Sequence, residues 1–432
     1  MNCVFLKALS AANYAPFANE VKFTTQVDNS KKEYMENTFE VGDNRLNKVS
    51  IVYGANGAGK TFFCKILREI QRLLDWSPLV NSPQFLCLPE LKSIDSTIPT
   101  FSFDPEFKEK PSSFMIEIIL DKTTYHYEFE LMGKKICYEL LTKKHRRTEK
   151  LLERKSSSYK DIVFRSEMKS FDINKHVIKE ESLSLSMAAF LNNELAIRIV
   201  TAIGNINILN MTAPRIQPSD SENSFSENRL QKYVNVLKRA DPTLRKLFVD
   251  VKEEDIRQII ESDDFENREI IAKKTTVAIH TEHAVFSGSV EKSSKQIEFF
   301  RDESLGTVKL FTILPHLYDV LEAGGVLILD EIENGLHLSL VVDIINLFNS
   351  PESNPHNAQL ICTSHQPLLV NRNTRRDQVW TISKDIYGKS QIKRISEMSP
   401  SRASVNLTNR IIEGAFGCNP EPFFSDHIEK DK

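Results

Sequence analysis

The sequence is poor in glycine, lacks paired cysteines and has no long uninterrupted hydrophobic run. Its six cysteines lie far apart and form no C-x-x-C pair, which argues against a zinc site or a dense disulfide framework and favours a reducing compartment. The longest apolar-looking stretch, Val308 to Leu329, contains several charged residues, so we do not expect it to span a membrane. The net charge of −3 gives no overall positive field that would attract nucleic acid.

The N-terminal segment also lacks the basic start and long apolar core of a secretory signal peptide. With the cysteine pattern, this predicts a cytoplasmic protein with no membrane partner. A chain of 432 residues can bury one large core or two ordinary ones.

The scarce glycines cluster at one point in the chain. There are only 14, yet three fall within a single motif that matches G-x-x-x-x-G-K-[ST] at every specified position. A short buried strand, Val49–Tyr53, precedes this motif, and apolar residues at helical spacing follow it. The motif residues are Gly54, Ala55, Asn56, Gly57, Ala58, Gly59, Lys60 and Thr61.

Such a loop turns its backbone N–H groups inward around phosphates, at the positive end of the following helix. Lys60 is therefore predicted to reach the β- and γ-phosphates of ATP, and the Thr61 hydroxyl to bind Mg²⁺. The alternative interpretation is an ordinary glycine turn before a helix. ATP and Mg²⁺ are thus the predicted cofactors.

Two acidic residues follow a second apolar strand, Val326–Leu329. Ligands of parallel sheets bind outside the carboxyl ends of the strands, so Asp330 and Glu331 are expected to meet the phosphate loop. Asp330 is predicted to hold Mg²⁺ and Glu331 to polarise the attacking water. The alternative is an acidic helix start. His365 ends the next strand, Gln359–Thr363, and is predicted to donate a hydrogen bond to the γ-phosphate.

A serine and a glycine lie at the start of the helix expected before the strand Val326–Leu329. Ser304 and Gly306, in the segment Glu303–Thr307, offer a hydroxyl and backbone N–H groups suited to an anion. An ordinary helix N-cap is the alternative interpretation. The position of the motif ahead of Asp330 is similar to that of the signature motif in ATP-binding-cassette proteins.

Together, Tyr53–Thr61, Glu303–Thr307, Leu327–His337 and Gln359–His365 resemble the bacterial ABC-type "AAA family" ATPases of the OLD, AbiL, Septu and PARIS (AriA-like) anti-phage defence group. The run Asp330-Glu331-Ile332-Glu333-Asn334-Gly335-Leu336-His337 is similar to the group's D-E-I-E-N-x-L-H-P, with Leu338 in place of the proline. Arg375–Trp380 and Gly414–Gly417 match the tail of one subgroup. The resemblance covers both ends of the chain well and the middle poorly.

The resemblance implies an α/β fold: an ABC-type P-loop ATPase head with an antiparallel β subdomain and a mostly helical insertion. It also implies a homo-oligomer, at least a dimer of heads, in which Ser304 and Gly306 of one subunit cap the nucleotide bound at Lys60 of the other. The stretch after His365 is too short for a Toprim nuclease, and no HNH-like cluster is present. We therefore expect a separate effector protein, such as a Toprim or HNH nuclease, controlled by this ATPase as sensor.

The same patterns predict three regions: an N-terminal ATPase lobe at 1–165, a mostly helical insertion at 166–285 and a C-terminal ATPase lobe at 286–432. In the first region, Phe114–Leu120 and Tyr125–Leu131 read as a β-hairpin. In the second, Asn228–Leu237 and Glu253–Ile260 read as helices, and the polar stretch Gln217–Glu227 as a loop.

A DNA-maintenance ATPase resembling RecF or SMC heads is the main alternative function. A basic stretch from Lys143 to Lys155 is the feature that would bind a phosphate backbone, although charge runs usually form solvated surface. Direct binding of nucleic acid is thus an open prediction. A scaffold that binds ATP with little turnover is a third class, against which Glu331 and His365 argue.

Overall fold

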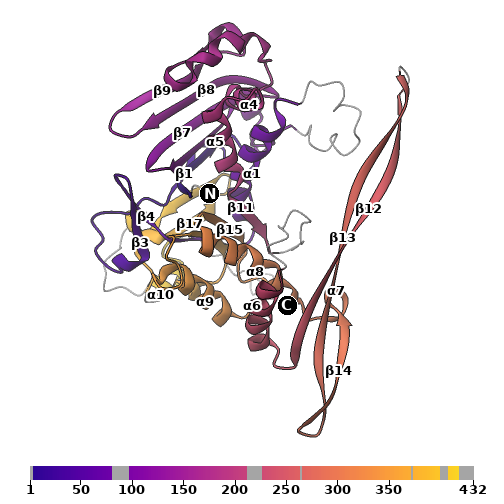
Figure 1. The fold of residues 1–432 in the computed structure, drawn as a ribbon. Helices are drawn as coiled ribbons and strands as arrows, with labels where there is room; N and C mark the ends of the chain where they lie inside the picture. The colour runs from indigo at the N-terminus through magenta and orange to yellow at the C-terminus, as the bar shows by residue number, and fades with distance from the viewer. Residues whose placement is uncertain are drawn as a thin grey trace, which may run out of the picture. The chain divides into compact units, whose positions relative to one another are not determined.

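The computed structural model describes residues 3–79, 97–211, 226–262, 265–370, 373–398 and 407–417, and the side chains of 251–277 are not described. It divides into two compact units (Figure 1). The first contains Met1–Asn210, Val320–Asn334 and Leu338–Lys432, and the second contains Met211–Asp319 and Gly335–His337. Most of the predicted loop Gln217–Glu227 lies outside the described residues.

A six-stranded sheet forms the centre of the first unit, in the order β11-β15-β16-β5-β17-β18. All neighbouring pairs are parallel except β17–β18. Its strands are β5 Val49–Tyr53, β11 Asn207–Asn210, β15 Val326–Asp330, β16 Gln359–Ser364, β17 Val379–Lys384 and β18 Ser390–Arg394. The strands predicted at Val49, Val326 and Gln359 are confirmed, as is the parallel sheet. Every residue of β5, β15 and β16 is buried, which explains their continuous apolar runs.

A seven-stranded antiparallel sheet makes up the β subdomain, in the order β10-β9-β8-β7-β6-β1-β2. Its strands are β1 Val4–Ala12, β2 Val21–Thr24, β6 Ser112–Leu120, β7 Thr123–Met132, β8 Lys135–Lys144, β9 Thr148–Arg154 and β10 Ile162–Phe164. The predicted hairpin is confirmed by the β6–β7 pairing. Its turn is two residues, Asp121 and Lys122, both at positive φ, which matches the twist of the flanking strands.

Helix α1, Lys60–Trp76, packs between the two sheets. It contacts β1 and β6 on one side and β15 and β16 on the other, and its buried residues repeat at helical spacing. The helix predicted to begin at Lys60 is thereby confirmed, and it joins both sheets into one hydrophobic core. The other helices of this unit are α4 Ser184–Phe190, α5 Glu194–Gly204, α9 Leu338–Asn349 and α10 Leu407–Ile412. A small hairpin pairs β3 Thr38–Val41 with β4 Asn44–Asn47.

The second unit combines helices with a long β-ribbon. Helix α6, Glu227–Ala240, confirms the helix predicted at Asn228–Leu237. It is followed by a three-stranded antiparallel sheet of β12 Leu244–Ser262, β13 Phe265–Ser287 and β14 Val290–Glu298. Then come α7 Phe299–Asp302 and α8 Leu305–Ala323, whose last residues, from Val320, belong to the first unit.

The helix predicted at Glu253–Ile260 is wrong, because these residues lie in β12 and pair with β13 along their whole length. Among its described residues, the region expected to be mostly helical therefore has helices up to Ala240 and β structure beyond it. Lysine, glutamate and aspartate are common in this stretch and disfavour strands locally. The pairing with β13 outweighs that local preference.

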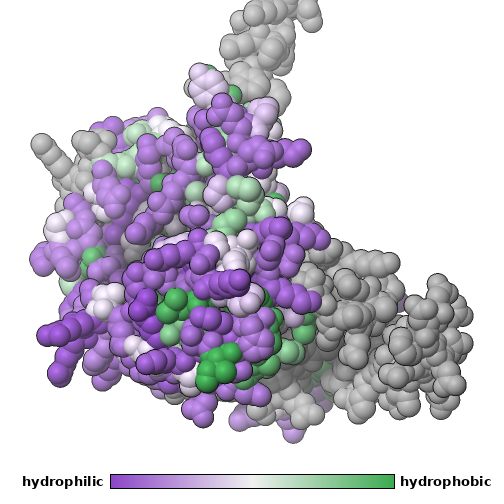
Figure 2. All heavy atoms as spheres, turned by 90° about the horizontal axis from the view of Figure 1, so that it is seen from above, coloured by the Kyte–Doolittle hydropathy of each residue, from purple (hydrophilic) through white to green (hydrophobic). Residues whose placement is uncertain are grey.

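No helix among the described residues has both the length and the apolar character needed to cross a bilayer. Figure 2 shows one face of the molecule, on which hydrophilic side chains predominate and hydrophobic ones gather only in small groups. Scattered groups of this kind are normal on protein surfaces.

Candidate functional site

The phosphate loop connects β5 to α1 at the carboxyl edge of the parallel sheet. Gly57 and Gly59 have φ values of +78° and +114°, which only glycine adopts without strain. A side chain at Gly54 would place its Cβ 2.4 Å from Ile382 Cγ2 on β17, so a glycine is needed there for close packing. The Gly54 N–H donates to the Ser364 carbonyl at 3.2 Å, which anchors the loop to the end of β16. These constraints explain all three motif glycines.

Lys60 points back into this loop. Its Nζ donates to the carbonyl oxygens of Gly54 at 2.8 Å and Ala55 at 3.0 Å, and the side chain is only 5% exposed. Burial lowers the pKa of the Lys60 ammonium, while the negative charges of Glu331, Glu333 and Asp330 act to raise it. The ammonium and these carboxylates therefore share one electrostatic environment, although they are far apart in the sequence.

Asp330 ends β15 and is held by the neighbouring strand. The Thr363 hydroxyl donates to Asp330 Oδ1 at 2.7 Å and accepts the Glu331 backbone N–H at 2.8 Å. Asp330 is 2% exposed, so this hydrogen bond fixes a buried carboxylate. Glu331 has a φ of +55°, a conformation that a non-glycine residue rarely adopts, and its Oε2 accepts from the Asn334 amide at 3.3 Å. Thr363 thus orients both predicted acidic residues.

Glu333 contacts the predicted His365 directly. Its Oε1 accepts the His365 backbone N–H at 2.6 Å and lies 2.8 Å from His365 Nδ1. The second oxygen, Oε2, is buried and has no hydrogen-bond partner among the described residues. A buried carboxylate oxygen without a partner is costly, and such groups concentrate at sites that bind a ligand or an ordered water.

Sequence reasoning did not assign roles to Glu333 and Thr363. Glu333 belongs to the same acidic run as Asp330 and Glu331, which was the available signal. Thr363 carried no signal of its own, because its role depends on the β15–β16 pairing.

The donors present fit a magnesium ion. The Thr61 hydroxyl and the Asp330 carboxylate are hard oxygen ligands, the class that Mg²⁺ takes together with phosphate oxygens and water. The hydrogen bond from Thr363 leaves Asp330 with a fixed orientation for such a role.

The predicted signature residues belong to the second unit. The Ser304 hydroxyl accepts the Thr307 backbone N–H at 3.1 Å and so caps α8, while the residue itself is exposed. A Cβ at Gly306 would lie 3.1 Å from the Gly335 carbonyl oxygen, which favours glycine there. The structure therefore brings Gly54–Thr61, Asp330, Glu331 and His365 together in the first unit, and places Ser304 and Gly306 in the second.

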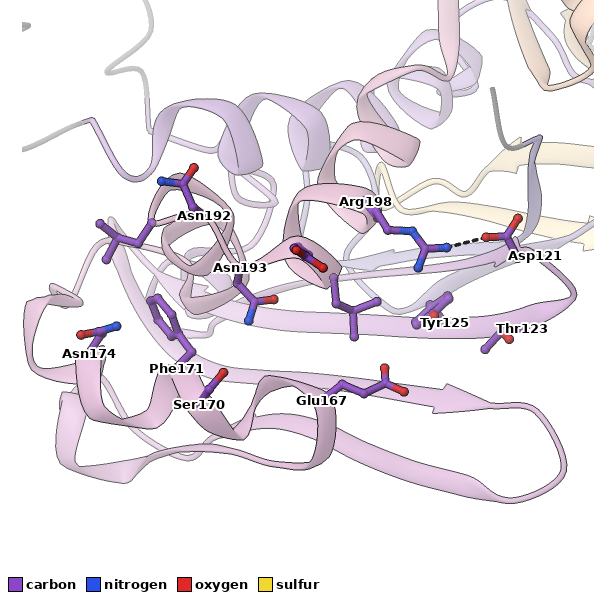
Figure 3. A pocket seen from close by; sticks show the side chains of 13 residues that line it. Asp121, Thr123, Tyr125, Glu167, Ser170, Phe171, Asn174, Asn192, Asn193 and Arg198 are labelled. Atoms are coloured by element: carbon purple, nitrogen blue, oxygen red, sulfur yellow. Dashed lines mark hydrogen bonds and ion pairs between the residues drawn. The ribbon is translucent and has the colours of Figure 1, made fainter.

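A separate groove of about 710 Å³ lies in the β subdomain (Figure 3). Arg198 from α5 forms an ion pair with Asp121 of the β6–β7 turn at one end, and Asn174 and Asn192 lie toward the other. None of the predicted site residues lines this groove.

Comparison with known proteins gives distant matches among solved structures and one match to a family profile. No curated protein matches it. Among solved structures, an SMC head bound to the C-winged helix domain of ScpA is similar with a TM-score of 0.40 and 11% identity, over 90% of this chain and 97% of that chain. The SMC head domain from Thermotoga maritima gives a TM-score of 0.35 and 9% identity, over 90% of this chain and 98% of that chain.

A family profile gives the more informative match, because it covers residues 49–371 and thus extends from β5 through the phosphate loop to the segment after His365. This range is well over half of the sequence. The chain therefore belongs to the family described as "AAA domain, putative AbiEii toxin, Type IV TA system".

Proposed function

We propose that this protein binds ATP with Mg²⁺ and hydrolyses it at composite sites formed between two subunits. The observation that carries the proposal is the strand order: β5, which leads through the glycine loop to Lys60, and β15, which ends at Asp330, flank β16 in parallel, so that their carboxyl ends meet at one edge of the sheet. This is the edge at which α/β proteins bind their ligands.

Each residue at this edge has a role that fits its surroundings. The loop N–H groups and Lys60 hold the phosphates, and Thr61 with Asp330 holds Mg²⁺, which neutralises phosphate charge when bound. Glu331 orients the attacking water. His365, held by Glu333 at 2.8 Å, donates toward the γ-phosphate. The oxygen of Glu333 that lacks a partner offers a second acceptor for that water.

Ser304 and Gly306 complete the nucleotide site of a second subunit in this proposal. A helix N-terminus with an exposed serine suits the γ-phosphate, because the backbone N–H groups and the helix dipole both favour an anion. The protein would then act as a homo-oligomer, at least a dimer of heads, in the cytoplasm.

The biological role we propose is that of sensor in a bacterial anti-phage defence system, controlling a separate toxic effector such as a Toprim or HNH nuclease. The family description, which names a putative toxin of a toxin–antitoxin system, supports a role of this class. Copurification from the native operon, followed by mass spectrometry, tests it: an effector protein should be retained with ATP. Recovery of the ATPase alone under all nucleotide conditions would contradict this role.

Mixing two inactive variants tests the composite site. Ser304→Arg blocks the signature while leaving the phosphate loop intact, and Lys60→Ala does the reverse. In their heterodimer one site contains both wild-type residues, so part of the ATPase activity should return. Full activity in a strict monomer, measured by light scattering with ATP present, would rule out a composite site.

Direct DNA binding is the second candidate, and the basic stretch is the relevant surface. Lys143 pairs with Glu149 and Glu167, Lys150 pairs with Glu153, and Arg154 is buried against backbone carbonyls. The exposed remainder is Lys155 and the end of β8 with the β8–β9 turn, Lys144 to Arg147. Salt-dependent binding of duplex DNA that is lost in Arg146→Ala/Arg147→Ala would favour the DNA-maintenance role over effector control.

A further inference from the structure

A histidine in the second unit is held between two carboxylates that come from different elements. His283 lies on β13, Asp241 follows α6, and Glu303 immediately precedes the signature residue Ser304. One ligand-type atom from each of the three residues lies within 4.8 Å of the others. Asp241 and His283 are partly buried, with side chains 31% and 13% exposed, and the Glu303 side chain is only 4% exposed.

Both ring nitrogens of His283 have partners on opposite sides of the ring. Nε2 lies 2.7 Å from Glu303 Oε1, while Nδ1 lies 2.9 Å from the Thr243 hydroxyl and 3.5 Å from Asp241 Oδ2. Asp241 in turn accepts the Thr243 hydroxyl at 2.7 Å. The two nitrogens therefore bond to partners on opposite sides of the ring. We interpret this arrangement as a chain of hydrogen bonds rather than a metal site, because a single metal ion could bind only one of the two nitrogens.

The Glu303 end of this chain of hydrogen bonds is also fixed. Its Oε1 accepts a second hydrogen bond from the Thr281 hydroxyl, which lies on the same strand as His283. The Glu303 carboxylate is therefore bound twice to β13, and the next residue in the chain is Ser304. Any displacement of Glu303 moves the backbone that presents the Ser304 hydroxyl and the first N–H groups of α8.

We propose that His283 and Glu303 are positioning residues, which hold the Ser304 turn in the orientation needed to cap a nucleotide bound by a second subunit. This inference rests on the proposed composite site. Thr281 and His283, which both contact Glu303, lie on β13. This part of the β-ribbon would therefore contribute to the nucleotide-dependent contact between subunits.

Steady-state kinetics of His283 variants provide the first test. His283→Ala should lower kcat at least about tenfold, the effect of misplacing one hydrogen-bonded group in a transition state. ATP affinity at the variant's own Lys60 should stay unchanged. His283→Gln should recover much of the rate, because its amide still donates to Glu303. His280→Ala, three residues earlier on β13, is the matched control and should behave as wild type.

Mixing variants separates a defect in the signature from a defect in the subunit's own nucleotide site. His283→Ala mixed with Lys60→Ala should regain activity, because one site of that heterodimer is intact. His283→Ala mixed with Ser304→Arg should show no such recovery, since both changes damage the signature. Provided that Lys60→Ala and Ser304→Arg restore each other, the opposite pattern, or no recovery in either mixture, would overturn the positioning role.

Failure of the composite site itself gives a different result. In that case, mixing Lys60→Ala with Ser304→Arg restores no ATPase activity, and the His283 variants do not affect this result. The remaining alternative is that Asp241, His283 and Glu303 bind a metal ion. Metal analysis tests it: stoichiometric zinc in the wild-type protein that is absent from His283→Ala would show a metal site and overturn the positioning role.

Discussion

At the scale of single residues, we expect Lys60 to be essential for nucleotide binding at the glycine loop. Lys60→Ala removes the ammonium that donates to the Gly54 and Ala55 carbonyls, so tight ATP binding should be lost. Equilibrium binding of a labelled ATP analogue measures this. Lys65→Ala removes an exposed lysine from the same helix and is the control. Equal ATP affinity in both variants would contradict the assignment of the loop.

Two glutamates compete for the role of orienting water, and conservative changes separate them. Glu331→Gln should keep ATP affinity and slow turnover at least about tenfold, given general-base contributions of roughly 10²–10⁴. Glu333→Gln should disturb His365 instead, because Glu333 accepts from its backbone and pairs with its ring. Single-turnover kinetics with each variant is the measurement. Near-normal turnover in Glu331→Gln alone would transfer the role to Glu333.

At the scale of elements, the sequence predicted β5, α1, β15 and β16 well because their signals are local. The apolar run indicates the strand. The glycine motif or the acidic pair that follows it indicates where the strand ends and where the candidate site residues lie. The ribbon could not be predicted in the same way. Its hydrogen bonds join Glu253 to Thr275 and similar distant pairs, so no local pattern records them. Thr363 illustrates the same limit within the site.

A row of charged side chains on the antiparallel sheet, the charge ladder, makes the free energy of unfolding depend on pH. It consists of Lys7, Glu117, His126 and Glu128. Hydrogen bonds to Glu117 and Glu128 raise the pKa of His126 to about 9. Burial alone would raise the pKa of Glu117, but the hydrogen bond from His126 and the charge of Lys7 lower it to about 2. His126 is thus protonated in the folded state at neutral pH.

Because the folded pKa of His126 exceeds its unfolded value of roughly 6.5, the folded state binds the extra proton between these values. The stabilisation is complete below the unfolded pKa and is lost as pH rises to about 9. Urea unfolding from pH 6 to 9.5 should therefore show a falling free energy of unfolding. His126→Gln should flatten this decline; an unchanged slope would mean that the ladder does not contribute.

For the whole molecule, we expect ATP hydrolysis without cleavage of nucleic acid. The one group of three or more His, Cys, Asp and Glu side chains positioned to hold a metal ion among the described residues is the Asp241 cluster, which is not the paired acidic site of a two-metal nuclease. Purified protein incubated with DNA or RNA and Mg²⁺ or Mn²⁺ should leave both intact. Cleavage that persists through stringent purification and in Lys60→Ala would reveal a nuclease site elsewhere in the chain.

The order of strands in the parallel sheet has a consequence for biosynthesis. Strand β5 precedes the phosphate loop, yet its partners on either side are β16 and β17, with Val49 opposite Leu360 and Ile51 opposite Val379. Translation proceeds at roughly 5–20 residues per second, so β5 waits roughly 15–60 s for its neighbours to be synthesised. During that interval β5 lacks both of its neighbours in the sheet, and Asp330 and Glu331 are synthesised only near its end. We therefore expect ATP, bound as proposed, to assist only the last stage of folding.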